Sequence, residues 1–260
     1  MVYETLPGQH SVRIYSEETI SVNTGNQNRV DLVLPVYNEK GNLEKLYEEI
    51  DAALSSEYNW KALFVDDGST DGSTKLIRKL ADKDDRVVLI RFAENSGQSA
   101  AFSAGFEYST APLVVTLDAD GQNDPADIPR MIGEMGETDM VAGYRENRRD
   151  SWWRKLGSRL GNSVRNWLTG DNIIDTGCSL KVFRNEVVKS FPVFEGMHRF
   201  FPTLARIEGY SITQVPTNHR SRVHGETKYS NMGRLKTTLW DVWAVCWLQD
   251  RHLDYEVEEG

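Results

Sequence analysis

The strongest chemical signal in the sequence is a pair of acidic residues, Asp118 and Asp120, separated by Ala119. They follow the apolar run 113–117, which is typical of a buried strand. Two carboxylates at the mouth of such a strand repel one another, and a divalent cation relieves that repulsion. Mg²⁺ or Mn²⁺ shared with a diphosphate fits these oxygens, and the side-chain carbonyl of Gln122 offers a third ligand. Acidic strand ends also serve as ordinary turns and caps, so the pair alone leaves that alternative open.

A second acidic group, Asp66 and Asp67, follows another apolar run. A carboxylate shielded from water discriminates well among bases, because it accepts from the N3–H of uracil or from guanine N–H groups. Upstream, Tyr37 has the ring to stack on a base, and Glu39 has the oxygens to bind a ribose hydroxyl. Each of these acids could instead form a turn or cap a helix. The pattern therefore predicts a nucleotide-binding edge, with local capping as the alternative.

These residues follow the strands of an alternating pattern. Apolar runs of strand length occupy residues 30–37, 60–67, 86–92, 112–120 and 139–145. Helical spacing of apolar residues occupies 42–54, 73–83, 99–109 and 126–135. Strands that alternate with helices predict an α/β fold: a mostly parallel, twisted sheet with helices on both faces and its ligand beyond the carboxyl ends of the strands. No GxGxxG follows the first strand, which argues against a dinucleotide-binding Rossmann domain.

The charge of the chain is unevenly distributed. The 260 residues carry a formal net charge of -9, which argues against a general nucleic-acid-binding role. Lys and Arg are nevertheless concentrated in 144–165, which holds seven of them against two acids, and in 219–236, which holds five against one. Such segments indicate a phosphate-bearing partner, and we assign an acceptor phosphate to Arg154, Arg159 and Arg220. Solvated surface charge is the alternative for each of these arginines.

Six groups of residues, in their order along the chain, resemble family 2 glycosyltransferases, and among them the dolichol- and undecaprenyl-phosphate sugar synthases. The groups span about residues 30–235 and are Pro35-Val36-Tyr37-Asn38-Glu39, Asp66-Asp67-Gly68-Ser69, Asn95-Ser96-Gly97, Asp118-Ala119-Asp120-Gly121-Gln122, Asp175-Thr176-Gly177-Cys178 and Gly225-Glu226-Thr227-Lys228-Tyr229. The resemblance implies a GT-A fold, a Rossmann-like α/β sheet with a C-terminal helical extension on the acceptor side. It also implies a UDP- or GDP-linked sugar donor, Mg²⁺ or Mn²⁺, and inversion at the anomeric carbon.

The resemblance also implies roles for individual residues. The nucleotide-sugar site would comprise Pro35, Tyr37, Glu39, Asp66, Asp67, Asp118, Ala119 and Asp120, and the metal ligands would be Asp118, Asp120 and Gln122. The catalytic set would comprise Asp120, Asp175, Arg145, Arg222 and Lys228, with the last two in a flexible loop that meets phosphates. Asp175 would act as a base toward a hydroxyl acceptor, or would orient groups if the acceptor is a phosphate, which is already an anion near neutral pH.

Two Trp-rich segments remain. Apolar and aromatic residues recur at helical spacing in 152–168 with basic residues between them, which predicts an amphipathic helix suited to a membrane surface or packed on the sheet. A second stretch, 239–248, suits a membrane interface or a contact between protomers of a homo-oligomer. It contains Asp241 and is far too short to cross a bilayer. The start of the chain lacks a signal-peptide pattern, so we expect a cytoplasmic protein, peripheral at most at the inner face of the membrane.

We therefore expect a polar arm at 1–28, a GT-A domain at 29–235, and a Trp-rich amphipathic helix with an acidic tail at 236–260. The expected function is an inverting, metal-dependent transfer of a hexose from a nucleoside-diphosphate sugar to a polyprenyl phosphate. Two alternatives stay open: a soluble glycosyltransferase acting on a sugar or protein hydroxyl, and a nucleotide-sugar-binding module without transferase activity. Cys178 has no His close in sequence and is expected to be a small buried side chain rather than a nucleophile.

Overall fold

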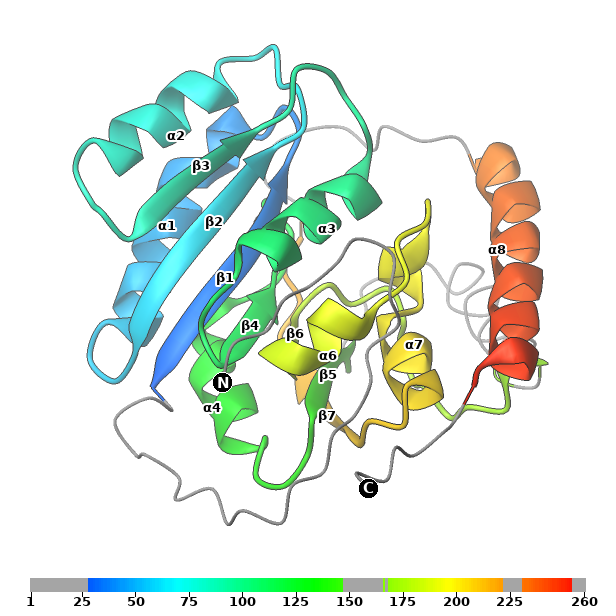
Figure 1. The fold of residues 1–260 in the computed structure, drawn as a ribbon. Coiled ribbons are helices and arrows are strands. Elements are labelled where there is room, and N and C mark those ends of the chain that lie inside the picture. Colours follow the sequence, from blue (N-terminus) through cyan, green and yellow to red (C-terminus); the bar gives the residue numbers. More distant parts are fainter. Residues whose placement is uncertain (1–27, 147–165, 167, 222–230, 254–260) are drawn as a thin grey trace, which may run out of the picture.

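A seven-stranded sheet of order β3-β2-β1-β4-β6-β5-β7 runs through the chain (Figure 1). The structure, a computed structural model, describes residues 28–146, 166, 168–221 and 231–253. The strands are β1 (Arg29–Val36), β2 (Asn59–Asp66), β3 (Val87–Arg91), β4 (Leu113–Thr116), β5 (Met140–Arg145), β6 (Lys181–Arg184) and β7 (Ile212–Thr217). All pairings are parallel except those of β6, which runs antiparallel between β4 and β5.

The helices cover both faces of this sheet. They are α1 (Lys40–Leu54), α2 (Ser73–Ala81), α3 (Gln98–Tyr108), α4 (Ile128–Gly133), α6 (Asn185–Ser190), α7 (Phe201–Ile207) and α8 (Asn231–Arg251), with short 3-10 turns η1 (Pro125–Asp127) and η2 (Met197–Arg199). One buried cluster joins the sheet to α1, α2 and α4, and a second joins it to α3, α6, α7 and α8. The expected α/β architecture is confirmed.

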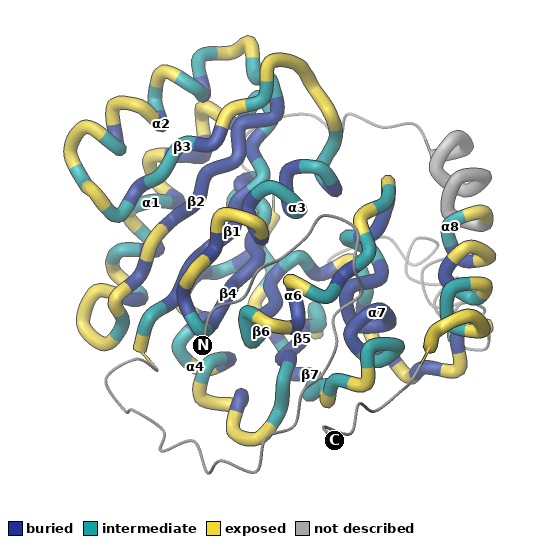
Figure 2. The backbone as a smooth tube through the Cα atoms, in the orientation of Figure 1, coloured by how far each residue is buried: buried dark blue, intermediate teal, exposed yellow. Residues whose placement is uncertain are grey.

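The apolar runs in the strands are continuous because both faces of the sheet are buried. Along β1, Leu32 and Leu34 belong to the cluster beneath α1, whereas Val33 belongs to the cluster beneath α3. Figure 2 shows these central strands dark blue, with exposed residues on the outer sides of the helices. Helix α3 approaches β1 closely at Gly105, where an added Cβ would stand 2.2 Å from Val33 Cγ1. This contact fixes α3, and with it the loop that precedes α3.

The second half of the described chain contains elements that the spacing of apolar residues did not predict. Strand β6 has 4 residues, α6 has 6 and α7 has 7, too few to show a strand or helix period. Helix α8 begins at Asn231, so the boundary expected between residues 235 and 236 falls inside a helix. The expected N-terminal arm and acidic tail lie outside the described residues, apart from Asn28. Among the helices that the structure describes, none has the length and hydropathy to cross a membrane.

Candidate active site

The loops after β1 and β2 are joined by Asn38. Its side-chain oxygen accepts from the amides of Thr70 at 2.8 Å and Asp71 at 3.3 Å, and its own amide donates to Ser69 Oγ at 2.9 Å. Asn38 adopts a positive φ of 56°, which asparagine tolerates better than most residues. Tyr37 is partly buried in the same loop. Two of the predicted nucleotide-binding segments are therefore side by side.

Glu39 stands immediately before α1 and is nearly buried. Its carboxylate accepts from Asn42 Nδ2 at 2.7 Å, and its amide donates to Ser73 Oγ at 3.1 Å. Because the carboxylate contacts a side chain of the first helical turn and no backbone amide there, Glu39 does not cap α1 through its side chain. A role toward a ribose hydroxyl stays a prediction.

Asp66 and Asp67 do different things at the end of β2. The fully buried Asp66 accepts from the Ser69 amide at 3.0 Å and from the Thr74 hydroxyl, which favours the turn interpretation for this residue. Asp67 accepts from the amides of Ser96 at 2.6 Å and Gly97 at 3.0 Å, in the loop before α3. Burial raises the pKa of Asp67 and the neighbouring Asp66 charge adds to this, while the two amides act in the opposite direction.

The acidic pair follows β4 at the same edge of the sheet. Asp118 Oδ1 accepts from Gln98 Nε2 at 2.8 Å, so the first residue of α3 contacts the first acid of the pair. Asp120 Oδ1 accepts from the Gln122 amide at 3.0 Å, and both acids are partly buried. Burial and the nearby Asp120 charge raise the pKa of Asp118 to about 6. The two carboxylates therefore lie close enough to repel one another.

This pair suits a divalent cation that is shared with a ligand. In the described part of the chain, no group of three or more His, Cys, Asp and Glu side chains could hold a metal on its own. Mg²⁺ is commonly held by one or two carboxylates together with substrate phosphates, and a repelling pair at a strand end fits that pattern. Gln122 contacts Arg220 instead, since its backbone carbonyl accepts from the Arg220 amide at 2.7 Å and Nε2 approaches the Arg220 carbonyl at 3.5 Å. Its role as a third ligand stays a prediction.

Arg145, at the end of β5, forms a two-pronged ion pair with Asp175. Arg145 Nε and Nη2 lie 2.6 Å and 2.9 Å from the two carboxylate oxygens, and Asp175 Oδ1 also accepts from the Gly177 amide at 3.0 Å. Asp175 is nearly buried. The structure brings these two predicted residues together although they are far apart in sequence.

Cys178 and Lys181 lie near this pair; the burial of Cys178 was predicted from the sequence and that of Lys181 was not. Cys178 is buried, as expected, and burial raises the pKa of its thiol. Lys181, a residue that the sequence reasoning missed, is almost completely buried and donates to the Cys178 carbonyl. The available signal was a single lysine within the otherwise apolar run 180–183.

Of the three arginines predicted to bind the acceptor phosphate, Arg220 is the one that lies within the described residues. Arg220 Nη1 binds both Glu49 carboxylate oxygens at 2.8 Å, and Nη2 lies 2.7 Å from Asp124. A phosphate at Arg220 would have to compete with these two acids. The positions of Arg154, Arg159, Arg222 and Lys228 lie outside the described residues, as does most of the predicted helix at 152–168.

Helix α8, orange to red in Figure 1, packs on the α7 side of the sheet through Val242 and Val245. Trp240, Trp243 and Trp247 lie on its opposite side and are 64%, 62% and 54% exposed. The expected contact of this face, with a membrane interface or with another protomer, stays a prediction.

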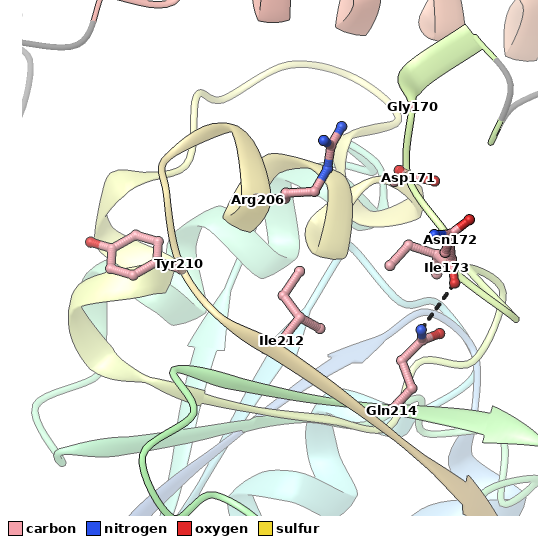
Figure 3. Close-up of a pocket in the computed structure, with 8 residues that line it drawn as sticks. All are labelled: Gly170, Asp171, Asn172, Ile173, Arg206, Tyr210, Ile212 and Gln214. Atoms are coloured by element: carbon pink, nitrogen blue, oxygen red, sulfur yellow. Dashed lines mark hydrogen bonds between the residues drawn. The ribbon is translucent and has the colours of Figure 1, made fainter.

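A separate cavity of about 280 Å³ lies between α7, β7 and residues 170–173 (Figure 3). Arg206, Tyr210 and Gln214 line it, and Gln214 Nε2 donates to the Asn172 carbonyl at 3.0 Å. No residue predicted for the nucleotide or metal site lines this cavity.

The chain matches a known protein family. The family model described as "Glycosyl transferase family 2" matches residues 31–191, so the chain belongs to this family. It is similar to the undecaprenyl-phosphate 4-deoxy-4-formamido-L-arabinose transferase of Aeromonas hydrophila, with 39% identity over 206 residues, 78% of this chain and 63% of the relative. For the enzyme of the same name from Edwardsiella ictaluri, the values are 37% over 216 residues, 82% and 66%. The chain thus spans about two thirds of the length of these relatives.

Solved structures confirm the predicted GT-A fold. Glucosyl-3-phosphoglycerate synthase from Mycobacterium tuberculosis, in complex with Mn²⁺, UDP and phosphoglyceric acid, superposes with a TM-score of 0.63 at 18% identity, over 87% of this chain and 80% of that one. A mannosyltransferase from Pyrobaculum calidifontis in complex with GDP-Man and Mn²⁺ gives 0.60 at 18% identity, over 88% and 66%. At this level of identity the likeness establishes the fold.

Proposed function

We propose that the chain transfers a sugar from a UDP- or GDP-linked donor to undecaprenyl phosphate, with inversion at the anomeric carbon and dependence on Mg²⁺ or Mn²⁺. The observation that carries the proposal is the close pair Asp118 and Asp120 at the strand edge that also holds Asp67 and the ion pair of Arg145 with Asp175. The names of the relatives support the acceptor. The nucleotides and cations bound in the solved GT-A structures support the donor and the cofactor.

The proposed chemistry divides between the two sides of this edge. On one side, Asp67 and the loops around Asn38 would bind the nucleoside. On the other, Asp118 and Asp120 would hold the cation, which supplies charge stabilisation to the departing diphosphate. Arg145 would add positive charge beside that leaving group.

In the transfer step a phosphate oxygen of the acceptor forms a bond to the anomeric carbon, and the bond from that carbon to the diphosphate oxygen breaks. The attacking oxygen is already anionic near neutral pH, so the step needs no general base. The Arg145 contact to both Asp175 oxygens supports an orienting role for Asp175. Holding the acceptor and donor in line would supply much of the acceleration.

The transferred sugar is the finer part of the proposal. We expect a hexose from the sequence, whereas the relatives carry 4-deoxy-4-formamido-L-arabinose in their names. The donor panel must therefore contain UDP-hexoses, GDP-mannose and a UDP-linked formamidopentose.

The decisive experiment incubates each labelled donor with Mn²⁺ and either undecaprenyl phosphate in detergent micelles or soluble oligosaccharides. We expect label to enter the organic phase only with the lipid phosphate, and EDTA to prevent it. Label in an aqueous glycan would instead establish the hydroxyl-acceptor alternative, with Asp175 as base. Nucleotide binding without donor consumption on any acceptor would establish a binding module.

A further inference from the structure

Lys181 places an ammonium group inside the sheet, where its side chain is 1% exposed. It is the first residue of β6 and pairs with Thr116 on β4 and Ala142 on β5. Because β6 runs opposite to both neighbours, its first residue lies at the edge where β4 ends, close to Asp118. The antiparallel direction of β6 therefore places a buried lysine next to the acidic pair.

The contacts of Lys181 connect it to both acidic parts of that site. Its Nζ donates to the carbonyl of Cys178, in the loop that carries Asp175, and this is the one hydrogen bond that the described residues give it. Desolvation lowers the pKa of Lys181, and the carboxylates of Asp175 and Asp118 act in the opposite direction. An ammonium has three donors, so a single acceptor leaves its charge poorly compensated by hydrogen bonds.

Packing does not explain a lysine at this position. Apolar residues of similar volume often replace buried charged groups without loss of stability, or with a gain, because they carry no desolvation cost. The surrounding charges do explain it. Asp118, Asp120 and Asp175 gather at this edge with Arg145 as a cation, and Lys181 adds a second positive charge beneath them.

Lys189 provides a matched comparison. Its Nζ also donates to backbone carbonyls, those of Phe106 at 2.5 Å and Glu107 at 2.9 Å. These lie at the end of α3 opposite to Gln98, away from the acidic pair. Lys189 as a residue is exposed, whereas Lys181 is almost completely buried.

We propose that Lys181 is a positioning residue: its ammonium holds the loop of Asp175 and Cys178 in place and supplies positive charge to both Asp118 and Asp175. This inference rests on the proposed transfer reaction, for which it names an additional residue.

The test compares Lys181→Met with Lys189→Met in the full chain. We expect Lys181→Met to keep the melting temperature and to lower kcat at least about tenfold, with a donor KM within about threefold of wild type. Hydrogen exchange of the Gly177 amide should also accelerate, because the loop loses its anchor. Lys189→Met should leave kcat and Gly177 exchange unchanged. If Lys181→Met does not fold, Lys181→Gln tests the charge alone: it lacks the ammonium but can still donate to the Cys178 carbonyl, so kcat should fall while Gly177 exchange stays near that of wild type.

A kcat for Lys181→Met equal to that of Lys189→Met, or unchanged exchange at Gly177, would overturn the inference. A loss of kcat that merely follows a loss of melting temperature would overturn it as well, because it would show a purely structural lysine. Failure of the proposed function looks different: wild type would transfer nothing to undecaprenyl phosphate, while faster Gly177 exchange in Lys181→Met than in Lys189→Met would still support the anchoring role of Lys181.

Discussion

The two halves of the candidate site are held together by different forces. In the nucleotide half, formed by the loops after β1, β2 and β3, carboxylates accept from neutral groups, as Asp67 does from the amides of Ser96 and Gly97. In the acidic half, formed by the loops after β4 and β5 and the start of β6, charges face charges, as in the Arg145 and Asp175 pair. Asp118 there has its pKa raised by burial and by Asp120.

This difference predicts that the nucleotide half contributes mainly to stability and the acidic half mainly to activity. Amide donors satisfy a buried carboxylate whether or not a ligand is present, so the nucleotide half is complete by itself. The acidic half holds like charges whose repulsion a cation relieves. Substitutions in the first half should therefore lower stability first, and substitutions in the second should lower activity first.

The largest effect is expected for Asp120→Ala. Loss of one carboxylate of the pair should lower turnover by about a hundred- to a thousandfold and abolish the stabilisation of donor binding by Mn²⁺. The melting temperature should not fall, because removal of this charge also removes repulsion. Activity and nucleotide thermal shift measure this, with the exposed Asp85→Ala as control. Unchanged turnover in Asp120→Ala would contradict the metal site.

Arg145→Lys and Asp175→Asn probe the ion pair. A lysine cannot reproduce the planar, two-pronged contact of the guanidinium with Asp175, so we expect kcat to fall by about ten- to a hundredfold in each variant, with near-native unfolding curves. Equal losses with a lipid phosphate acceptor would support the orienting role of Asp175. A much larger loss in Asp175→Asn than in Arg145→Lys would contradict that role and favour a base.

Asp67→Asn tests the nucleotide half. The new amide group cannot accept from all the donors that Asp67 binds, which leaves a partly buried N–H group without its acceptor. We expect the free energy of unfolding to drop by about 1–3 kcal/mol, measured by urea denaturation without ligand. Thr70→Ala, at an exposed position of the loop after β2, is the control. A stable variant that lost only turnover would break the distinction between the two halves.

The raised pKa of Asp118 predicts opposite pH dependences for stability and for binding. Without ligand, the folded protein takes up this proton near pH 6 and the unfolded chain near 3.8, so the contribution of Asp118 to stability is present at low pH and lost as pH rises between these values. Binding of Mn²⁺ with UDP needs the carboxylate, so affinity should fall by up to about tenfold per pH unit below the raised pKa. Both pH dependences are measured for wild type and for Asp118→Asn, by unfolding without ligand and by binding of Mn²⁺ with UDP. The same pH dependences in both proteins would show that groups other than Asp118 cause them.

The same contrast explains what the sequence could and could not predict. The nucleotide half depends on local order: Asp66 and Ser69 share one turn, and Asp67 follows directly from a strand whose apolar run is unmistakable. The alternation of strands and helices was enough to place these residues at one edge. The capping alternative for Asp66 could be weighed only once its contacts were known.

The acidic half depends on contacts between residues far apart in sequence. Nothing local links Arg145 to Asp175, and the family resemblance named both residues without pairing them. Strand β6 is too short for a periodic signal, and its antiparallel direction follows from the three-dimensional arrangement, so the burial of Lys181 at the site could not be read from the chain. The contacts of Arg220 with Glu49 and Asp124 also join separate elements.

The smallest effect on the chemistry is expected for the exposed face of α8. Replacing Trp240, Trp243 and Trp247 with serine removes mostly exposed surface and the edge-to-face contact between Trp240 and Trp243, so each change should alter the free energy of unfolding by no more than about 1 kcal/mol. Transfer to a short, water-soluble prenyl phosphate should remain, because neither half of the site contains these residues. If the face meets a membrane, the variant should lose flotation with anionic vesicles while wild type keeps it; if it meets another protomer, the variant should lose the dimer in sedimentation instead. A variant that still floats with vesicles and still forms the dimer would contradict both interpretations of this face.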